Sequence, residues 1–205
     1  DRLVSEQVLG LIPQSAEKIY VGKEVGCGRE IDPVELMISA AAEGRTVIRL
    51  KGGDPVLFGR GAEEMIALAE AGIDYEIVPG VSALCSVAIS AGVPVTHREI
   101  ASEVVIRSGH AMKDDPEDEA EPPGRGTTFV YFMAVNRLAE VVEDLRAEGV
   151  EEDTPVAIVE NGTLPQERVI CSSLSEIAGE AATAGRNRQH TQEGPVGGHP
   201  GTSRI

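Results

Sequence analysis

Gly52, Gly53 and Asp54 are the residues of this sequence best suited to hold a small molecule. They follow residues 46–50, an apolar run typical of a short strand, and a segment with helical spacing comes after them. The glycines lack a Cβ, so the backbone can turn sharply and approach a ligand, and Asp54 adds a carboxylate at the end of the strand. A simple Gly-Gly-Asp-Pro turn is an equally good interpretation. The phosphate-loop pattern is absent, because Lys51 precedes the glycines.

The composition is that of a globular protein without features of nucleic-acid binding. Of the 205 residues, 41% are hydrophobic, which is enough for one large domain or two small ones. The net charge of −16 disfavours nucleic acid, because phosphate binding needs a basic stripe, and it would also suit a protein that works in high salt. There is no apolar run of about 18 residues and no signal-peptide pattern, so we expect a cytoplasmic protein without membrane contact.

The cysteines and histidines do not form a metal-binding pattern. Cys27, Cys85 and Cys171 are widely spaced and odd in number, which favours buried free thiols over a disulfide framework or a zinc site. His97 and His110 are each more typical of loop histidines bonded to backbone than of general bases. We therefore expect no bound metal.

The first half of the chain alternates between predicted strands and helices, which is typical of an α/β fold with a parallel sheet. Glycines and prolines mark the ends of most of these segments. Helices are predicted over residues 5–12, 33–42, 62–71 and 84–91, and strands over 19–21, 46–50 and 75–78. The helix over 84–91 is so apolar that we expect it to be packed on both sides.

The second half repeats this alternation and ends in a different kind of sequence. Strands are predicted over residues 104–107, 127–133, 155–159 and 168–171, and helices over 137–148 and 174–182. We expect an α/β fold of two lobes, each a mostly parallel sheet flanked by helices: residues 1–98, then 99–182. Residues 183–205 have no apolar period and are predicted to be a disordered tail.

Eight short segments, taken in order, form a specific pattern. They include Arg-Leu-Lys-Gly-Gly-Asp-Pro within residues 47–61 and Thr-His-Arg within 92–98. The segments are residues 1–4, 21–23, 47–61, 78–83, 92–98, 108–110, 131–133 and 160–163. Over roughly residues 1–178 the chain thereby resembles the tetrapyrrole (corrin/porphyrin) methyltransferases. The two quoted motifs favour the branch acting on uroporphyrinogen III over relatives that act on later corrin intermediates or that form diphthamide.

This resemblance implies transfer of methyl groups from S-adenosylmethionine to C2 and C7 of uroporphyrinogen III, giving precorrin-2 for sirohaem and cobalamin. It also implies a homodimer whose cofactor lies between two α/β lobes. A first strand and a proline-containing Gly-rich loop are expected before Asp1, so the resemblance implies an N-terminally truncated first lobe. The residues after 182 depart from the apolar closing strand that the family has.

Site residues carried over from the resemblance fall into three groups. Asp1 and Lys23 match the proposed proton acceptor and donor. The S-adenosylmethionine site would be lined by Gly52, Gly53, Asp54, Leu57, Ser82, Ala83, Met133 and Gly162. Because the substrate carries carboxylates around its rim, cations at loop or strand ends are expected to bind it, and these are Lys51, Arg60, Arg98 and Arg107. Each of these cations, taken alone, is more typical of an ordinary surface charge, and only their shared placement at loop and strand ends favours the substrate role.

Three other interpretations stay open at this point. The chain could be a non-catalytic remnant of such an enzyme, since part of the expected cofactor site would precede Asp1. It could methylate another corrin or a protein. It could also be a general nucleotide-binding α/β module.

Overall fold

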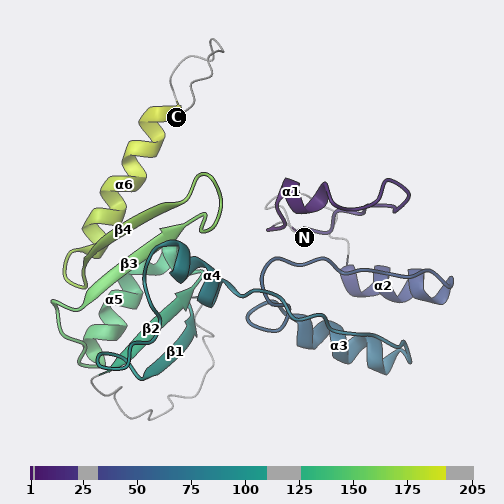
Figure 1. Cartoon of the computed structure of the whole chain (residues 1–205), viewed down its shortest axis with the longest axis horizontal. Helices are drawn as coiled ribbons and strands as arrows, with labels where there is room; N and C mark the ends of the chain where they lie inside the picture. Colours follow the sequence, from purple (N-terminus) through teal and green to yellow (C-terminus); the bar gives the residue numbers. More distant parts are fainter. Residues whose placement is uncertain (2, 23–31, 110–125, 193–205) are drawn as a thin grey trace. The chain divides into compact units, whose positions relative to one another are not determined.

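The computed structural model describes residues 1, 3–22, 32–109 and 126–192. The chain divides into two compact units, Asp1–Ser86 and Val87–Ile205. The division falls inside a helix and precedes Arg98, after which the boundary was expected. Figure 1 labels the helices and strands of both units, and each unit is described by itself.

Helices of the first unit begin where the sequence predicts. Helix α1 (Glu6–Leu9) is capped by Ser5, whose hydroxyl accepts the Val8 N–H, and α2 (Pro33–Ala42) is capped by Asp32 with proline in its first turn. Helix α3 (Gly61–Glu70) follows the Gly-Gly-Asp-Pro segment. Helix α4 (Ala83–Ser90) begins in this unit and ends in the other.

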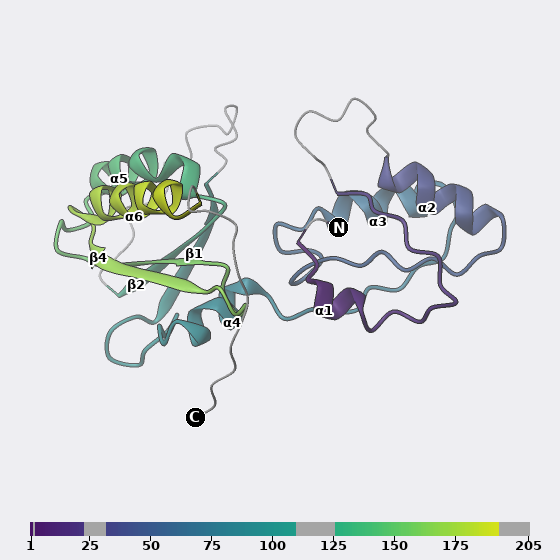
Figure 2. The same ribbon diagram turned by 90° about the horizontal axis from the view of Figure 1, so that it is seen from above.

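The strands predicted over residues 19–21, 46–50 and 75–78 are not paired. Within the described part of the first unit, the structure contains no β-ladder, and these three segments run as elongated traces (Figure 2). Their apolar side chains are correspondingly open to solvent, with Ile48 82% exposed. A strand needs a neighbour at about 4.8 Å to form ladder hydrogen bonds. The three segments therefore lack ladder hydrogen bonds among the described residues of this unit.

Among the described residues, the paired strands belong to the second unit. Strand β1 (Glu103–Ser108) pairs in parallel with β2 (Thr127–Phe132), and Thr127 Oγ1 donates to the Glu103 carboxylate at 2.7 Å. Strand β3 (Pro155–Glu160) pairs antiparallel with β4 (Arg168–Ser173). The α/β class is thus confirmed, while the second strand pair departs from the expected parallel arrangement.

Helix α5 (Leu138–Ala147), the start of α6 (Ile177–Gln192) and the turn before α6 form the buried core of the second unit, and side chains of β2, β3 and β4 pack against it. After the 3-10 turn Val135–Arg137, helix α5 points one apolar stripe inward, and helix α6 starts beside it. Figure 2 shows these two helices side by side on one face of the strands. The buried residues are Val141, Val142, Leu145, Leu174 and Ile177.

Replacing Ile177 by alanine should lower the stability of the second unit more than replacing Ile100 by alanine. Ile177 is fully buried, and truncating such a side chain costs about 2–5 kcal/mol through lost burial and the cavity left behind. Ile100 lies in the same unit but is exposed, so Ile100→Ala should cost less than about 1 kcal/mol. Amide hydrogen exchange in α5 and β4 measures the difference. Equal protection in the two variants would contradict this core assignment.

Three further expectations are corrected by the structure. Helix α4 contains no buried residue, although its composition predicted packing on both sides. Cys85 and Cys171 are free but exposed rather than buried, while Cys27 lies outside the described residues. The predicted disorder from residue 183 is wrong as far as Gln192, because α6 continues to that residue. Alanine, arginine and glutamine in this stretch favour helix, and no proline interrupts it.

Candidate functional site

Asp54 organises the turn that follows residues 45–51. Its Oδ1 accepts the backbone N–H groups of Val56 at 2.9 Å and of Leu57 at 3.3 Å. Such side-chain bonds to the following backbone are the usual way in which aspartate fixes a turn. The local sequence Asp-Pro therefore determines the shape of the loop, and Leu57 contributes through its backbone.

The same carboxylate connects this turn to a second loop. Its Oδ2 accepts the Gly80 N–H at 3.2 Å, across 26 residues of sequence. Gly80 also approaches the first loop very closely, because a Cβ at this position would lie 2.1 Å from the Gly53 carbonyl oxygen. We call residues 52–59 and 78–83 the Asp54 loop pair. Its geometry requires both the carboxylate and a glycine at position 80.

Backbone hydrogen bonds keep Asp54 ionised. The N–H of Val56 lowers the pKa of its carboxyl most, followed by that of Gly80, and the smaller effect of desolvation opposes them. We expected this carboxylate to line the predicted cofactor site. The structure assigns both oxygens to the loop pair, so ligand contact by Asp54 would use their remaining lone pairs.

Gly53, Ser82 and Ala83 come together in the loop pair. A Cβ on Gly53, which has φ +71°, would lie 3.9 Å from the Val81 carbonyl oxygen and 4.0 Å from the Ala83 nitrogen. Ser82 Oγ accepts the Leu84 N–H at 3.1 Å and thereby begins helix α4. The predicted residues Gly53, Ser82 and Ala83 thus lie close together, and Gly52 and Gly53 are exposed.

Phe58 and Arg60, which follow Leu57, have strained backbone angles. Phe58 and Arg60 have φ +52° and +57°, in the left-handed region that non-glycine residues rarely adopt. Gly61 sits against the Pro55 carbonyl oxygen, where a Cβ would come within 2.4 Å. Arg60 itself is exposed and pairs with Glu63 at 3.3 Å. Its guanidinium is thus presented to solvent at the end of the turn.

Lys51 and Asp1 belong to one ion-pair network with two residues that we did not predict. Lys51 Nζ lies 3.1 Å from Glu64 Oε2, and Arg49 bonds to both Glu64 and Asp1. The sequence offers only a weak signal for it, namely cations two residues apart in an extended segment and a glutamate in the first turn of α3. Lys23, the predicted proton donor, lies outside the described residues.

Met133 and Gly162 lie in the second unit, at two strained loops. Met133 follows β2 with φ +58°, and Gly162 stands between Asn161 and Thr163, which have φ +52° and +66°. A Cβ on Gly162 would meet the Val87 side chain at 2.6 Å. Such outliers persist only where the surroundings impose them and are common at functional loops. The cofactor roles of Met133 and Gly162 stay predictions.

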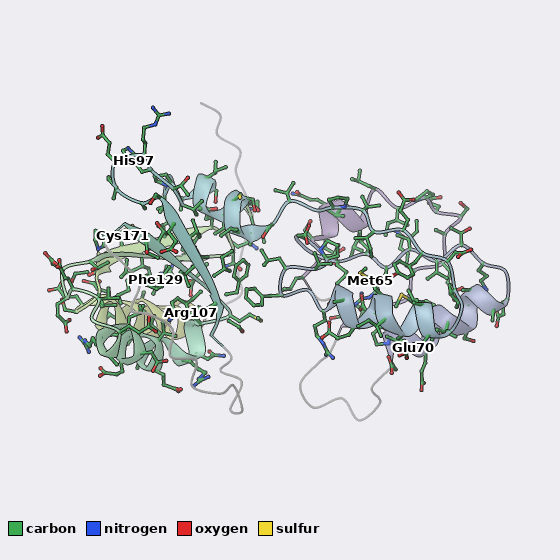
Figure 3. All side chains as sticks on the ribbon, turned by 90° about the horizontal axis from the view of Figure 1, so that it is seen from below. Met65, Glu70, His97, Arg107, Phe129 and Cys171 are labelled. Carbon is green, nitrogen blue, oxygen red and sulfur yellow. The ribbon has the colours of Figure 1, made fainter. Side chains whose placement is uncertain are left out.

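Arg107 is engaged within the second unit. Its guanidinium pairs with Glu148, donates to Tyr131 Oη at 3.0 Å, and lies 5.4 Å from the ring centre of Phe129 (Figure 3). The hydrogen bond that Arg107 donates to the Glu148 carboxylate is the main cause that raises the pKa of Arg107, and burial raises the pKa of Tyr131. These contacts favour a structural role, whereas Arg98 is exposed.

Neither a metal cluster nor a membrane-spanning helix is found in the described part of the chain. No three histidine, cysteine or acidic residues there are placed to hold an ion. None of the described helices has the length and apolar character needed to cross a bilayer.

Comparison with known proteins gives a consistent result. The family model described as Tetrapyrrole (Corrin/Porphyrin) Methylases matches residues 1–178. Siroheme synthase 2 of Yersinia enterocolitica is 41% identical over 87% of this chain, and siroheme synthase of Edwardsiella ictaluri is 40% identical over 86%. These matches cover 38% and 39% of the relatives, so the chain spans about two-fifths of their length.

Solved structures of two methyltransferases are also similar. Uroporphyrin-III C-methyl transferase from Thermus thermophilus, complexed with S-adenosyl homocysteine, is 36% identical with a TM-score of 0.72, covering 88% of this chain and 77% of that one. The cobalamin biosynthetic enzyme cobalt precorrin-4 methyltransferase is 28% identical with a TM-score of 0.76, covering 90% of this chain and 77% of that one.

Proposed function

Because this chain belongs to the tetrapyrrole (corrin/porphyrin) methylase family, we propose that it transfers methyl groups from S-adenosylmethionine to ring carbons of uroporphyrinogen III. The observation that carries the proposal is the Asp54 loop pair, in which the predicted cofactor residues Gly52, Gly53, Ser82 and Ala83 gather. The 36% identity to a uroporphyrin-III C-methyl transferase supports the choice of substrate.

The loop pair fits a ligand that approaches closely and has polar edges. Gly52 and Gly53 present exposed backbone without side chains, and Ala83 offers the first N–H of helix α4. S-adenosylmethionine supplies an electrophilic methyl carbon when it is bound. The protein then has to align the donor with the acceptor carbon and to move protons, which requires neither a nucleophilic side chain nor a metal. Asp1 would accept the ring proton and Lys23 would donate one.

Recognition of the anionic substrate falls first to the cations that are most available. Arg98 is exposed, and Arg60 makes only a surface ion pair with Glu63, which contributes little and is easily exchanged. Lys51 and Arg107 are already held by Glu64 and Glu148. They would reach a substrate carboxylate only by giving up those partners. Arg60 and Arg98 are therefore the better substrate candidates.

The full proposal is two methylations, at C2 and C7, giving precorrin-2 for sirohaem and cobalamin synthesis by a cytoplasmic homodimer. The siroheme synthases are much longer than this chain, so the proposal covers only the methyl transfer. A second candidate, methylation of a later corrin intermediate, is favoured by the TM-score of 0.76 to cobalt precorrin-4 methyltransferase.

Calorimetry and a product assay test the proposal. We expect S-adenosylhomocysteine to bind with measurable heat and to raise the thermal midpoint, and uroporphyrinogen III to yield a red-fluorescing methylated product. Absence of heat and of a thermal shift would favour a non-catalytic remnant. Binding without product would favour the later-corrin alternative, and competition by ATP would favour a general nucleotide-binding module.

A further inference from the structure

Four charged residues from three segments of the first unit make a continuous chain of contacts. Arg49 Nη2 lies 3.2 Å from Asp1 Oδ2, and Arg49 Nε lies 3.0 Å from Glu64 Oε1. Lys51 Nζ donates to both Glu64 oxygens, at 3.1 and 3.2 Å. Glu64 thus pairs with both cations, while Nη2 of Arg49 contacts Asp1.

These contacts are shielded from water, unlike most ion pairs of the described residues. The side chains of Lys51, Glu64 and Arg49 are 9%, 13% and 18% exposed, and that of Asp1 is 32% exposed. Partly desolvated charges interact more strongly than surface charges, and each depends on its partners. Removal of one member therefore changes the field at the others.

We propose that Glu64 is a positioning residue for Asp1, acting through the guanidinium of Arg49. Glu64 fixes the guanidinium at Nε, so that Nη2 is presented to the Asp1 carboxylate, and it also pairs with Lys51. This inference deepens the proposed function, because it rests on Asp1 as the acceptor of the ring proton. It assigns Glu64 to the control of proton affinity at that acceptor.

The charges around Asp1 determine the direction of each effect. Among the described residues, Arg49 pairs directly with its carboxylate, and Glu64 pairs with both Arg49 and Lys51. Loss of the Glu64 charge would leave their field uncompensated. Loss of the Arg49 charge would remove the direct partner.

Two substitutions should therefore shift the titration of Asp1 in opposite directions. In Glu64→Gln, uncompensated cations favour the ionised carboxylate, so its titration midpoint should fall by about one pH unit. In Arg49→Gln, the lost partner should raise the midpoint by a similar amount. Carbon-13 NMR of labelled aspartate follows both shifts without substrate. With uroporphyrinogen III, Glu64→Gln should lower kcat about tenfold with little change in KM for S-adenosylmethionine.

Matched controls and separate readouts keep the two proposals apart. Glu70→Gln removes the same charge from the exposed end of α3 (Figure 3), and Arg45→Gln removes an exposed arginine; neither should move the Asp1 midpoint. Unchanged midpoints in both test variants, or shifts of one sign, would overturn the positioning role. Opposite shifts without any methylation by the unsubstituted chain would refute the proposed function and support the positioning of Asp1.

Discussion

Replacing Gly80 by alanine is expected to weaken S-adenosylhomocysteine binding by more than about a hundredfold. The new Cβ would lie 2.1 Å from the Gly53 carbonyl oxygen, 2.9 Å from the Gly53 carbonyl carbon and 3.2 Å from Asp54 Cα. All three are backbone atoms, so no side-chain rotation relieves the contact. The two loops must separate, which also lengthens the bond from the Gly80 N–H to Asp54. Calorimetric titration measures the loss.

Gly10→Ala is the matched control for this experiment. A Cβ on Gly10 would meet its nearest atoms, the Gln7 and Glu6 carbonyl oxygens, at an acceptable 3.4 Å, and the residue has an ordinary φ of −66°. The affinity of Gly10→Ala for S-adenosylhomocysteine should equal that of the unsubstituted chain. If Gly80→Ala also bound within about threefold of that value, the Asp54 loop pair would not be the ligand site.

Local sequence was sufficient to predict the fold where pairing partners were present. The β-branched and aromatic residues of 104–107 and 127–133 predicted β1 and β2, which the structure confirms as a parallel pair. The segments 46–50 and 75–78 have the same kind of composition, but they find no partner among the described residues. Composition indicates that a segment is extended, whereas sheet formation depends on a neighbouring strand that composition does not supply.

The candidate site was predictable where one loop carries it. Gly52, Gly53 and Asp54 follow from the Gly-Gly-Asp-Pro turn, but the bond from Gly80 to Asp54 crosses 26 residues and was missed. Its only signal was the Pro-Gly pair in the second loop. The partners of Lys51 and Arg107, Glu64 and Glu148, were missed for the same reason, because tertiary packing decides which acid each cation meets.

Asp54→Asn should weaken S-adenosylhomocysteine binding by about tenfold or more, because the amide cannot accept all three backbone N–H groups. The carboxylate accepts from Val56 and Leu57 on one oxygen and from Gly80 on the other. In asparagine, one of these oxygens becomes an NH₂ group that faces a donor. One loop must then lose its anchor, and the thermal midpoint should fall. Titration calorimetry and thermal melting measure the two effects.

Acidification should narrow the difference in thermal midpoint between Asp54→Asn and the unsubstituted chain. The backbone donors hold the pKa of Asp54 below its ordinary value of 3.8 in the folded state. Its stabilising contribution is therefore fully present above that value and is lost as the pH falls through the lowered pKa. Asp74→Asn, an exposed aspartate of the same unit, should show no such difference at any pH. A difference between Asp54→Asn and the unsubstituted chain that stayed constant down to about pH 2 would mean that the carboxylate charge does not hold the loops together.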